Sequence, residues 1–548
     1  MKIYDFGSDE LAFLDKKLKK FLIHGIIYKR GDLMHFFSRI TTWIAKNKNG
    51  EIKAEGKDWN KWWMPVIGFF AFLWFMIRVI PKPSRFRYPC QRAAFPLAVG
   101  FISWFTAVFG FTFSLKKSLE YFRKARYKVL ATFLLLSLIS GGIFLAVNSD
   151  ESATARQEGP IGRAKGINPG RVVWNYNPEA TSWDGESNYW WDTKYTDGEV
   201  VSEMWSSSLS RLAGTDNPQK AWEKLFHHFN KEKRNLDRDY RSGEKVVIKL
   251  NLNTHKSYSD NDNEVDLSPI TTEVIVSSLI EKGKVNAGDI VLYDASRPIA
   301  DKIYNPIKEK YPEITFVDNR GSRGRKKAEV DNNVEIHYPD RNTTDNIPRS
   351  VVEAEYLINL ASLKKHSLAG ITLTAKNHFG SIYNNRSKNW TPSHLHDGIN
   401  ARSREMGSPN PLVSLMGHKE LGGKTLLYVI DALYGGMNQQ TVRPDRWQMQ
   451  PFNDDWTSSL FISQDGVAID SVGFDFLNTE TDLLQYSENY LHEAALADKN
   501  DTTDYDPEGD GQNLESLGVH EHWNSPGEKL YSGNQDNNTD GIELIKDF

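Results

Sequence analysis

The chain is 548 residues long, which is more than one ordinary domain requires. Its 67 basic and 71 acidic residues give a formal net charge of −4, and without a basic excess we expect no nucleic-acid partner. The only cysteine is Cys90, so the chain after Asp150 can form no disulfide, no thiolate zinc site and no iron–sulfur cluster.

Residues 1–61 contain an amphipathic segment. Its apolar residues follow a helical spacing, with lysines on the other faces; they are Leu11, Leu14, Leu18, Phe21 and Leu22. Such a helix lies on an anionic membrane surface, or it packs against a partner subunit of a membrane complex. The sequence leaves both interpretations open.

Three apolar runs follow within residues 62–147, at 62–80, 93–113 and 129–147. Each is close to the ~20 residues that cross a bilayer as a helix, so we predict three transmembrane helices. Because Pro65 and Pro96 interrupt the first two runs, one span plus a re-entrant hairpin is the alternative.

Basic residues in the loops predict the orientation of these spans. The loop between the second and third runs is rich in lysine and arginine, whereas the stretch after the third, "NSDESATARQEGP", is mildly acidic. Basic loops stay in the cytoplasm, so we expect the large C-terminal part to be extracytoplasmic. Four basic residues of the first loop oppose this orientation: Lys82, Arg85, Arg87 and Arg92.

Beyond the spans, the pattern predicts a polar linker at 148–169 and an aromatic-rich extension at 170–244. The tryptophans of "VVWNYNPEATSWDGESNYWWD" either pack against the main domain or form a stacking surface for a ligand such as a sugar. Strand and helix patterns then alternate over 245–480, which predicts a two-lobed α/β core. An acidic segment at 481–548 ends the chain.

In α/β folds, ligands bind beyond the carboxyl ends of the strands. We therefore expect one edge of the sheet to gather the polar residues that end these strands, namely Asn251, Asn253, Asp294, Arg297, Asn359, Lys364, His366, Asp431 and Asp470.

The densest ionisable chemistry at this edge lies in "SLKKHSLAGITLTAKNHFGS", residues 362–381. A lysine close to another lysine and a histidine has a lowered pKa, which makes it a better base or nucleophile. Histidine can move protons near neutral pH, and glycine lets the backbone approach a ligand. The alternative is a structural network in which these cations neutralise Asp431 or Asp470.

Four segments in order resemble the family called domain of unknown function 362: "VVIKLNLN", "IVLYDAS", "YLINLASLKKHSLAGITLTAKNHFG" and "ISQDGVAIDSVGFDFL". The closing "LESLGVHEHWN" is similar to membrane-anchored bacterial members, which implies the bacterial inner membrane. Many members carry ferredoxin-type cysteines, but this chain does not. A redox role would therefore need a partner protein.

The chain also resembles nickel-pincer lactate racemase at its site. It has "DASRP" from Asp294 to Pro298, followed at matching spacing by His366, Gly370, Lys376 and Gly380. The resemblance implies proton chemistry for His366, a cofactor anchor at Lys376 and a phosphate contact at Arg297. The chain departs from the racemase at Leu373 and Thr374, which replace a glycine pair, and His337 is a candidate for a further catalytic histidine.

The predicted site has two groups of residues. The catalytic candidates are His366, Lys376 and Lys364. The candidates for binding a cofactor or substrate are Asp294, Ser296, Arg297, Gly370, Asn377 and Gly380.

Two metal sites are predicted elsewhere. His394 and His396, one residue apart beside Asp397, could bind nickel or zinc, or they are exposed loop histidines. Two acidic loops fit the spacing of a calcium loop. Their ligands would be Asp504, Asp506, Glu508 and Glu515 in the first, and Asp536, Asn538, Asp540 and Asp547 in the second. Solvated acidic turns are the alternative.

Three functions are consistent with these features. The first is a membrane-anchored enzyme, isomerase- or racemase-like or redox-associated, that binds a small anionic substrate or cofactor at a cationic site. The second is a non-catalytic binding or scaffold subunit of a membrane complex. In the third, a partner's redox centre transfers electrons and this chain is the scaffold.

Overall fold

The computed structural model describes residues 159–252, 255–437, 443–499, 503–535 and 540–548. The predicted amphipathic segment and the three predicted spans lie outside these residues. Among the helices that are described, none combines the length and the apolar character needed to span a membrane.

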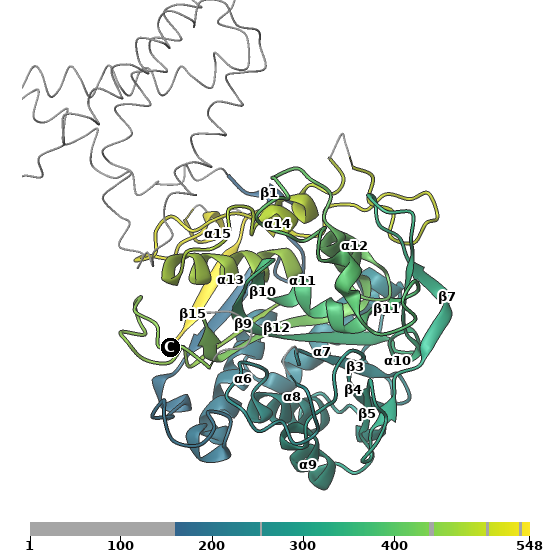
Figure 1. Ribbon diagram of the computed structural model, residues 1–548. Coiled ribbons are helices and arrows are strands. Elements are labelled where there is room, and N and C mark those ends of the chain that lie inside the picture. Colours follow the sequence, from purple (N-terminus) through teal and green to yellow (C-terminus); the bar gives the residue numbers. More distant parts are fainter. Residues whose placement is uncertain (1–158, 253–254, 438–442, 500–502, 536–539) are drawn as a thin grey trace, which may run out of the picture. The chain divides into compact units, whose positions relative to one another are not determined.

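A ten-stranded mixed sheet forms the centre of the fold (Figure 1). Its order is β15-β2-β13-β12-β9-β3-β4-β5-β6, with β10 paired to β9. Strands β3, β4, β5, β6, β9 and β12 are mutually parallel, whereas β13 is antiparallel to β12 and β2. The strands are β2 Arg171–Tyr176, β3 Val246–Leu250, β4 Ile290–Asp294, β5 Thr315–Asp318, β6 Lys326–Lys327, β9 Tyr356–His366, β10 Gly370–Thr372, β12 Thr425–Gly436, β13 Ser459–Ser463 and β15 Glu543–Asp547.

Helices cover both faces of this sheet. Figure 1 shows α6, α8 and α9 on one side and α11, α13 and α14 on the other. Strand residues alternate between two cores: Val246 and Ile248 pack towards the first group of helices, and Val247 packs towards the second. The helices are α6 Gly198–Ala213, α7 Pro218–Arg234, α8 Pro269–Glu281, α9 Asp301–Lys310, α10 Arg349–Val352, α11 Thr374–Asn377, α12 Pro411–Gly417, α13 Gly466–Glu480, α14 Asn489–Ala495 and α15 Ser532–Gln535.

Side-chain caps fix where the longer helices begin. The hydroxyl of Ser268 accepts a hydrogen bond from the Thr271 N–H at 3.4 Å, and Pro269 follows as the first residue of α8. Asp465 caps α13 by accepting from the N–H groups of Val467 and Ala468 at 3.0 and 2.9 Å. The α/β alternation predicted for 245–480 is confirmed.

The described residues from 159 to 548 lie in one compact unit, and a division of them into two lobes is not seen. Segments predicted as linker, extension and acidic tail are built into it. β1, Ile161–Gly162, pairs with β14, Val519–His520, and β2 lies between β13 and β15. A smaller three-stranded sheet has the order β11-β8-β7, with strands Tyr383–Asn384, Asp345–Pro348 and Val330–Ile336.

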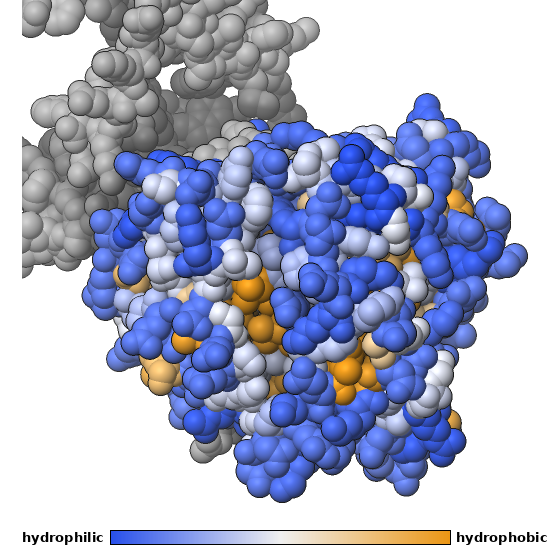
Figure 2. All heavy atoms as spheres, turned by 90° about the horizontal axis from the view of Figure 1, so that it is seen from below, coloured by the Kyte–Doolittle hydropathy of each residue, from blue (hydrophilic) through white to orange (hydrophobic). Residues whose placement is uncertain are grey.

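Three of the four tryptophans of the aromatic segment are core residues, whereas Trp191 is half-buried. Trp174, Trp183 and Trp190 are at most 2 % exposed, so the packing interpretation is confirmed for them. Trp183 stacks on Trp456 with ring centroids 5.3 Å apart. Figure 2 shows that the face seen from below is mostly hydrophilic, with hydrophobic atoms visible only in a few places.

Candidate functional site

The central strand β9 continues beyond the end of β3 and forms a hairpin with β10. In this hairpin Lys364 pairs with Thr372, and His366 pairs with Gly370. Gly370 has φ +82°, and a Cβ there would lie 1.9 Å from the Oγ of Ser487. The glycine is therefore required by the turn and by this close packing, rather than by a ligand.

A buried carboxylate of α13 holds the start of α11. Asp470 accepts hydrogen bonds from the N–H and hydroxyl of Thr374 at 2.9 and 2.7 Å, and from the Ala375 N–H at 3.0 Å. The Tyr490 hydroxyl donates to it at 3.0 Å. Asp431 likewise accepts from the Ser268 N–H at 2.8 Å. The ion pairs expected of these two aspartates with the lysines of residues 362–381 are absent among the described contacts.

Lys249 lies at the centre of a buried polar network at the end of β3. Its Nζ lies 2.9 Å from Oδ2 of Asp294 and donates to the Asn377 Oδ1 at 3.1 Å. A Cβ at Gly380 would lie 2.5 Å from both the Asp294 oxygen and the lysine nitrogen. Asn377 and Gly380, predicted to bind a cofactor, therefore support this ion pair.

The "DASRP" turn is held by the same aspartate. The other oxygen of Asp294, Oδ1, accepts from the N–H and hydroxyl of Ser296, both at 2.8 Å, and from the Arg297 N–H at 3.1 Å. Asp294 and Ser296 thus shape the turn, and they place Arg297 with an exposed side chain. The charge of Arg297 still reaches the site, because it is one cause of the lowered pKa of Lys376.

Lys364 is almost completely buried and has partners. Its Nζ donates to the backbone carbonyl of Val265 and lies 3.4 Å from Oδ1 of Asp266. Burial lowers the pKa of Lys364, and the attraction of Asp266 opposes this effect. Lys364 is therefore a paired cation that adds positive charge to its surroundings.

His366 is held as a neutral imidazole. Its Nδ1 accepts hydrogen bonds from the N–H groups of Leu368 and Ala369, both at 3.1 Å, which assigns the proton to Nε2. Burial, followed by the charges of Lys376 and His396, holds the pKa well below its ordinary value. His366 can thus donate a hydrogen bond through Nε2, but its Nδ1 is not free to act as a base.

Lys376 differs from the other buried lysines of this edge. Its side chain has no acidic partner among the described residues, and its Nζ lies 4.2 Å from the centroid of the Phe379 ring. Burial and then the charges of Lys364, Arg297 and Lys249 lower its pKa to about 7. An amine with this pKa exists in both neutral and protonated forms at neutral pH, so it can accept or donate a proton.

Sequence reasoning did not identify Lys249 or His378 as site residues. His378 accepts a hydrogen bond at Nε2 from the Asn359 amide at 3.1 Å, and no partner for its buried Nδ1 is found in the described chain. Burial, with the charge of Lys249, lowers the pKa of His378 to about 3. A lysine inside the apolar strand "VVIKL" was the available signal for this network.

The structure separates the two predicted metal-binding histidines. His394 Nε2 lies 2.7 Å from Oδ2 of Asp345, and its Nδ1 lies 2.7 Å from the Asn384 amide nitrogen, so both nitrogens are engaged. His396 instead packs edge-on against Phe379 with ring centroids 5.7 Å apart, and burial, followed by the charge of Lys376, lowers its pKa. His337 lies half-exposed, with Nε2 3.8 Å from a Glu335 oxygen.

Backbone N–H groups already bind two carboxylates of the first acidic loop. Asp506 accepts from the N–H groups of Gly509 and Gly511, both at 2.8 Å, and Glu508 accepts from the Lys419 N–H at 2.6 Å. Glu515 lies 3.6 Å from Arg163.

Within the described residues, the acidic ligands predicted for the first loop do not form a close group of three. Asp504 accepts from the Asn513 amide at 2.8 Å. In the second loop, Asp536 and Asn538 lie outside the described residues, Asp540 is described, and Asp547 belongs to β15. Calcium binding stays a prediction, and an unchanged melting temperature with a chelator would count against it.

A second buried ionic cluster borders Lys364. The Nε2 of His255 lies 3.2 Å from Asp260 and 3.7 Å from Asp266. Lys302 pairs with Asp260 at 2.8 Å, as Lys364 pairs with Asp266 at 3.4 Å. Each aspartate therefore already pairs with a lysine, so the positive and negative charges of this cluster balance.

These features define an α/β protein whose central sheet ends in a buried, lysine-rich polar edge, where the described residues provide no acid partner for the Lys376 amine. The family model described as "Domain of unknown function (DUF362)" matches residues 246–475. This match supports the resemblance to that family over the region from β3 to α13. No curated protein matches the sequence.

Proposed function

We propose that the described unit binds a small carboxylate or phosphate anion beside Lys376, and that Lys376 accepts a proton from it. The observation that carries the proposal is the buried amine of Lys376, which lies among cations and has no acidic partner within the described residues. Buried charges are normally paired, so a bound anion would complete this site.

The neighbouring groups divide the remaining roles. His366 donates a hydrogen bond to the anion through Nε2, because two backbone N–H groups hold its Nδ1. Arg297 supplies a permanent positive charge near Lys376, in the place that the resemblance to nickel-pincer lactate racemase gives to the phosphate contact. A proton passing from a substrate carbon to Nζ leaves the electron pair on the substrate, where these cations stabilise it.

Return of a proton to the opposite face of the carbon by a second acid would give a racemase, and return of the proton by Lys376 to a neighbouring atom of the substrate would give an isomerase. We carry over the placing of His366 and Lys376 from the racemase, and not its nickel cofactor. Leu373, which takes the place of a glycine, is buried under Gly473, and Thr374 is fixed by Asp470, so this segment lacks the mobility of a glycine pair.

We further propose that three N-terminal spans anchor this unit outside the cytoplasm of a bacterium, where it would meet subunits of a membrane complex. The support is the apolar character of the runs at 62–80, 93–113 and 129–147 and the basic loop before the third.

The test is a search by mass spectrometry for small molecules released from the purified full chain, followed by titration with L-lactate and inorganic phosphate. We expect a carboxylate or phosphate to be released from the wild type, and binding to be lost in Lys376→Gln. Lys365→Gln is the matched control, since Lys365 is the next residue after Lys364 in β9 and is bound to Thr481 and Asp482 instead.

Two outcomes would change the proposal. Equal anion binding by wild type and Lys376→Gln would overturn it. Binding that depends on Lys376, but without exchange of the substrate's carbon-bound proton with deuterium from solvent, would instead establish the alternative, a non-catalytic binding subunit.

A further inference from the structure

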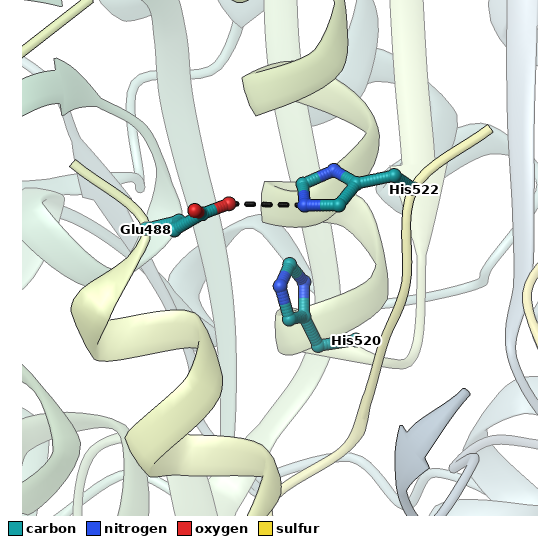
Figure 3. A group of neighbouring side chains, drawn as sticks. All are labelled: Glu488, His520 and His522. Carbon is teal, nitrogen blue, oxygen red and sulfur yellow. Dashed lines mark ion pairs between the residues drawn. The ribbon is translucent and has the colours of Figure 1, made fainter. Parts of the chain in front are cut away.

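The closing motif "GVHEHWN" places two histidines beside a carboxylate from another part of the chain. His520 ends β14 and His522 follows two residues later, and the centroids of the two imidazole rings lie 5.0 Å apart. Glu488 immediately precedes the first residue of α14. Figure 3 shows the three side chains directed towards one another, and one ligand atom from each lies within 4.8 Å of the others.

Both imidazoles are held from behind by α13. Ser471 Oγ lies 2.8 Å from Nδ1 of His520, and Asp475 Oδ1 lies 2.7 Å from Nδ1 of His522. These two supporting residues are four apart and therefore share one face of the helix. Metal-binding histidines are usually fixed in this way, with one nitrogen bound to a supporting oxygen and the other left for the metal.

The second nitrogens face the carboxylate. Nε2 of His522 lies 3.0 Å from Oε2 of Glu488. Within the described residues, no hydrogen bond to Nε2 of His520 is found. Asp475 is itself fixed, because its Oδ2 accepts from the Tyr531 hydroxyl at 2.8 Å and the Trp523 N–H at 3.0 Å.

The charges distinguish this cluster from the buried group around His255. There, two lysines already pair with the two aspartates. Here, Glu488 and Asp475 have no lysine or arginine partner among the described ion pairs, and only His522 lies between them. A divalent cation bound here would balance the charge of the two carboxylates.

We propose that Glu488, His520 and His522 form a site for one divalent transition-metal ion. Two imidazoles and one carboxylate are the ligand set of catalytic zinc sites and of non-haem iron sites, which leave coordination positions open. The side chains of Glu488 and His522 are 28 % and 31 % exposed, so a water molecule or a substrate oxygen can reach the metal.

The site is independent of the anion site in its chemistry, but the two share their supporting elements. On α13, Asp470 holds α11 while the next residue, Ser471, holds His520. On the other side, Ser487 packs against Gly370 of the His366 hairpin, and the next residue is the ligand Glu488.

The experiment uses the full chain, purified with a tag that lacks histidine, stripped with a chelator and then loaded with Zn²⁺ alone. After desalting, bound zinc is counted by elemental analysis. We expect His520→Ala and His522→Ala each to hold one equivalent less than the wild type, and Ser471→Ala to keep the site with a 10- to 100-fold weaker affinity. His227→Ala is the matched control, because His227 also lies between two carboxylates, Asp237 and Asp239, but has no second histidine beside it in the described structure.

Equal zinc content in the wild type, His520→Ala and His522→Ala would overturn the proposal. Should either variant fail to fold, as judged by circular dichroism, Co²⁺ loading of the wild type decides. We expect visible d–d absorption bands at one equivalent of Co²⁺ in the wild type, unchanged in His227→Ala. A wild-type spectrum without such bands would refute the site.

Discussion

Replacing Lys376 by methionine should stabilise the protein at neutral pH. The buried ammonium has no acidic partner in the described chain, and its pKa falls from 10.5 to about 7. At 1.36 kcal/mol per pKa unit, holding this amine in the folded state costs about 4 kcal/mol at pH 7. Methionine fills a similar volume without this cost, although relaxation of the site will reduce the gain.

The pH dependence gives the sharper signature. Between pH 7 and 10 the unfolded chain binds a proton at this lysine that the folded chain does not, so wild-type stability rises with pH relative to Lys376→Met. We expect the advantage of the variant to shrink from about 4 kcal/mol at pH 7 to about 1 kcal/mol at pH 10. The assay is urea unfolding of the full chain, dialysed free of small anions, at several pH values.

Lys249→Met is the control for removing any buried lysine from this edge. Lys249 is paired with Asp294 at 2.9 Å, so its loss strands a buried carboxylate and should cost about 3–5 kcal/mol at pH 7. The reasoning would be refuted if Lys376→Met lost as much stability as Lys249→Met, or if its difference from the wild type did not change with pH.

Three further predictions test the surrounding structure. Gly380→Ala should lower the free energy of unfolding by about 3 kcal/mol, because its Cβ would lie 2.5 Å from both members of the Lys249–Asp294 pair. Gly527→Ala is the control and should be nearly neutral, since a Cβ there would have nothing within 4 Å. Equal effects of the two substitutions would contradict the packing described. Asp470→Ala leaves the first N–H groups of α11 without a partner and should lower the free energy of unfolding by about 2 kcal/mol or more. We also expect it to lose anion binding in the titration with L-lactate and phosphate. A variant that binds normally would show that α11 does not need this cap. Cys90, the single cysteine, should react in intact cells with a membrane-impermeant maleimide if the proposed orientation holds; labelling only after lysis would reverse it.

The alternating core was predictable because each strand and helix is encoded locally. Runs such as "KVVIKLNLN" and "PITTEVIVSSLIEKG" carry their own periodicity and caps, and they became β3 and α8. The described residues from 159 to 548 lie in one compact unit rather than two lobes, and the order of the sheet depends on distant pairing. β2 pairs with β15 at one edge of the sheet, and their bonded residues Arg171 and Glu543 are 372 residues apart in the sequence. No local sequence pattern predicts such a pairing.

The candidate site was predictable in its location and less so in its roles. Clustering of lysines and histidines at strand ends indicated Lys364, His366 and Lys376, and the resemblance to the racemase gave their spacing. The sequence does not show which lysine pairs with a carboxylate, because the partners Asp294 and Asp266 come from other segments of the chain. The supports of His520 and His522 likewise come from α13, about 50 residues away in sequence.

The pKa of Lys376 tests the central claim most directly. It can be measured in the full chain, dialysed free of small anions, from the pH dependence of its rate of labelling by an amine-reactive reagent, with mass spectrometry reporting the modified residue. We predict a midpoint near pH 7, about 3.5 pH units below that of an ordinary exposed lysine. A midpoint near 10 would show that the amine is solvated or paired with a carboxylate, and the anion site proposed here would then be wrong.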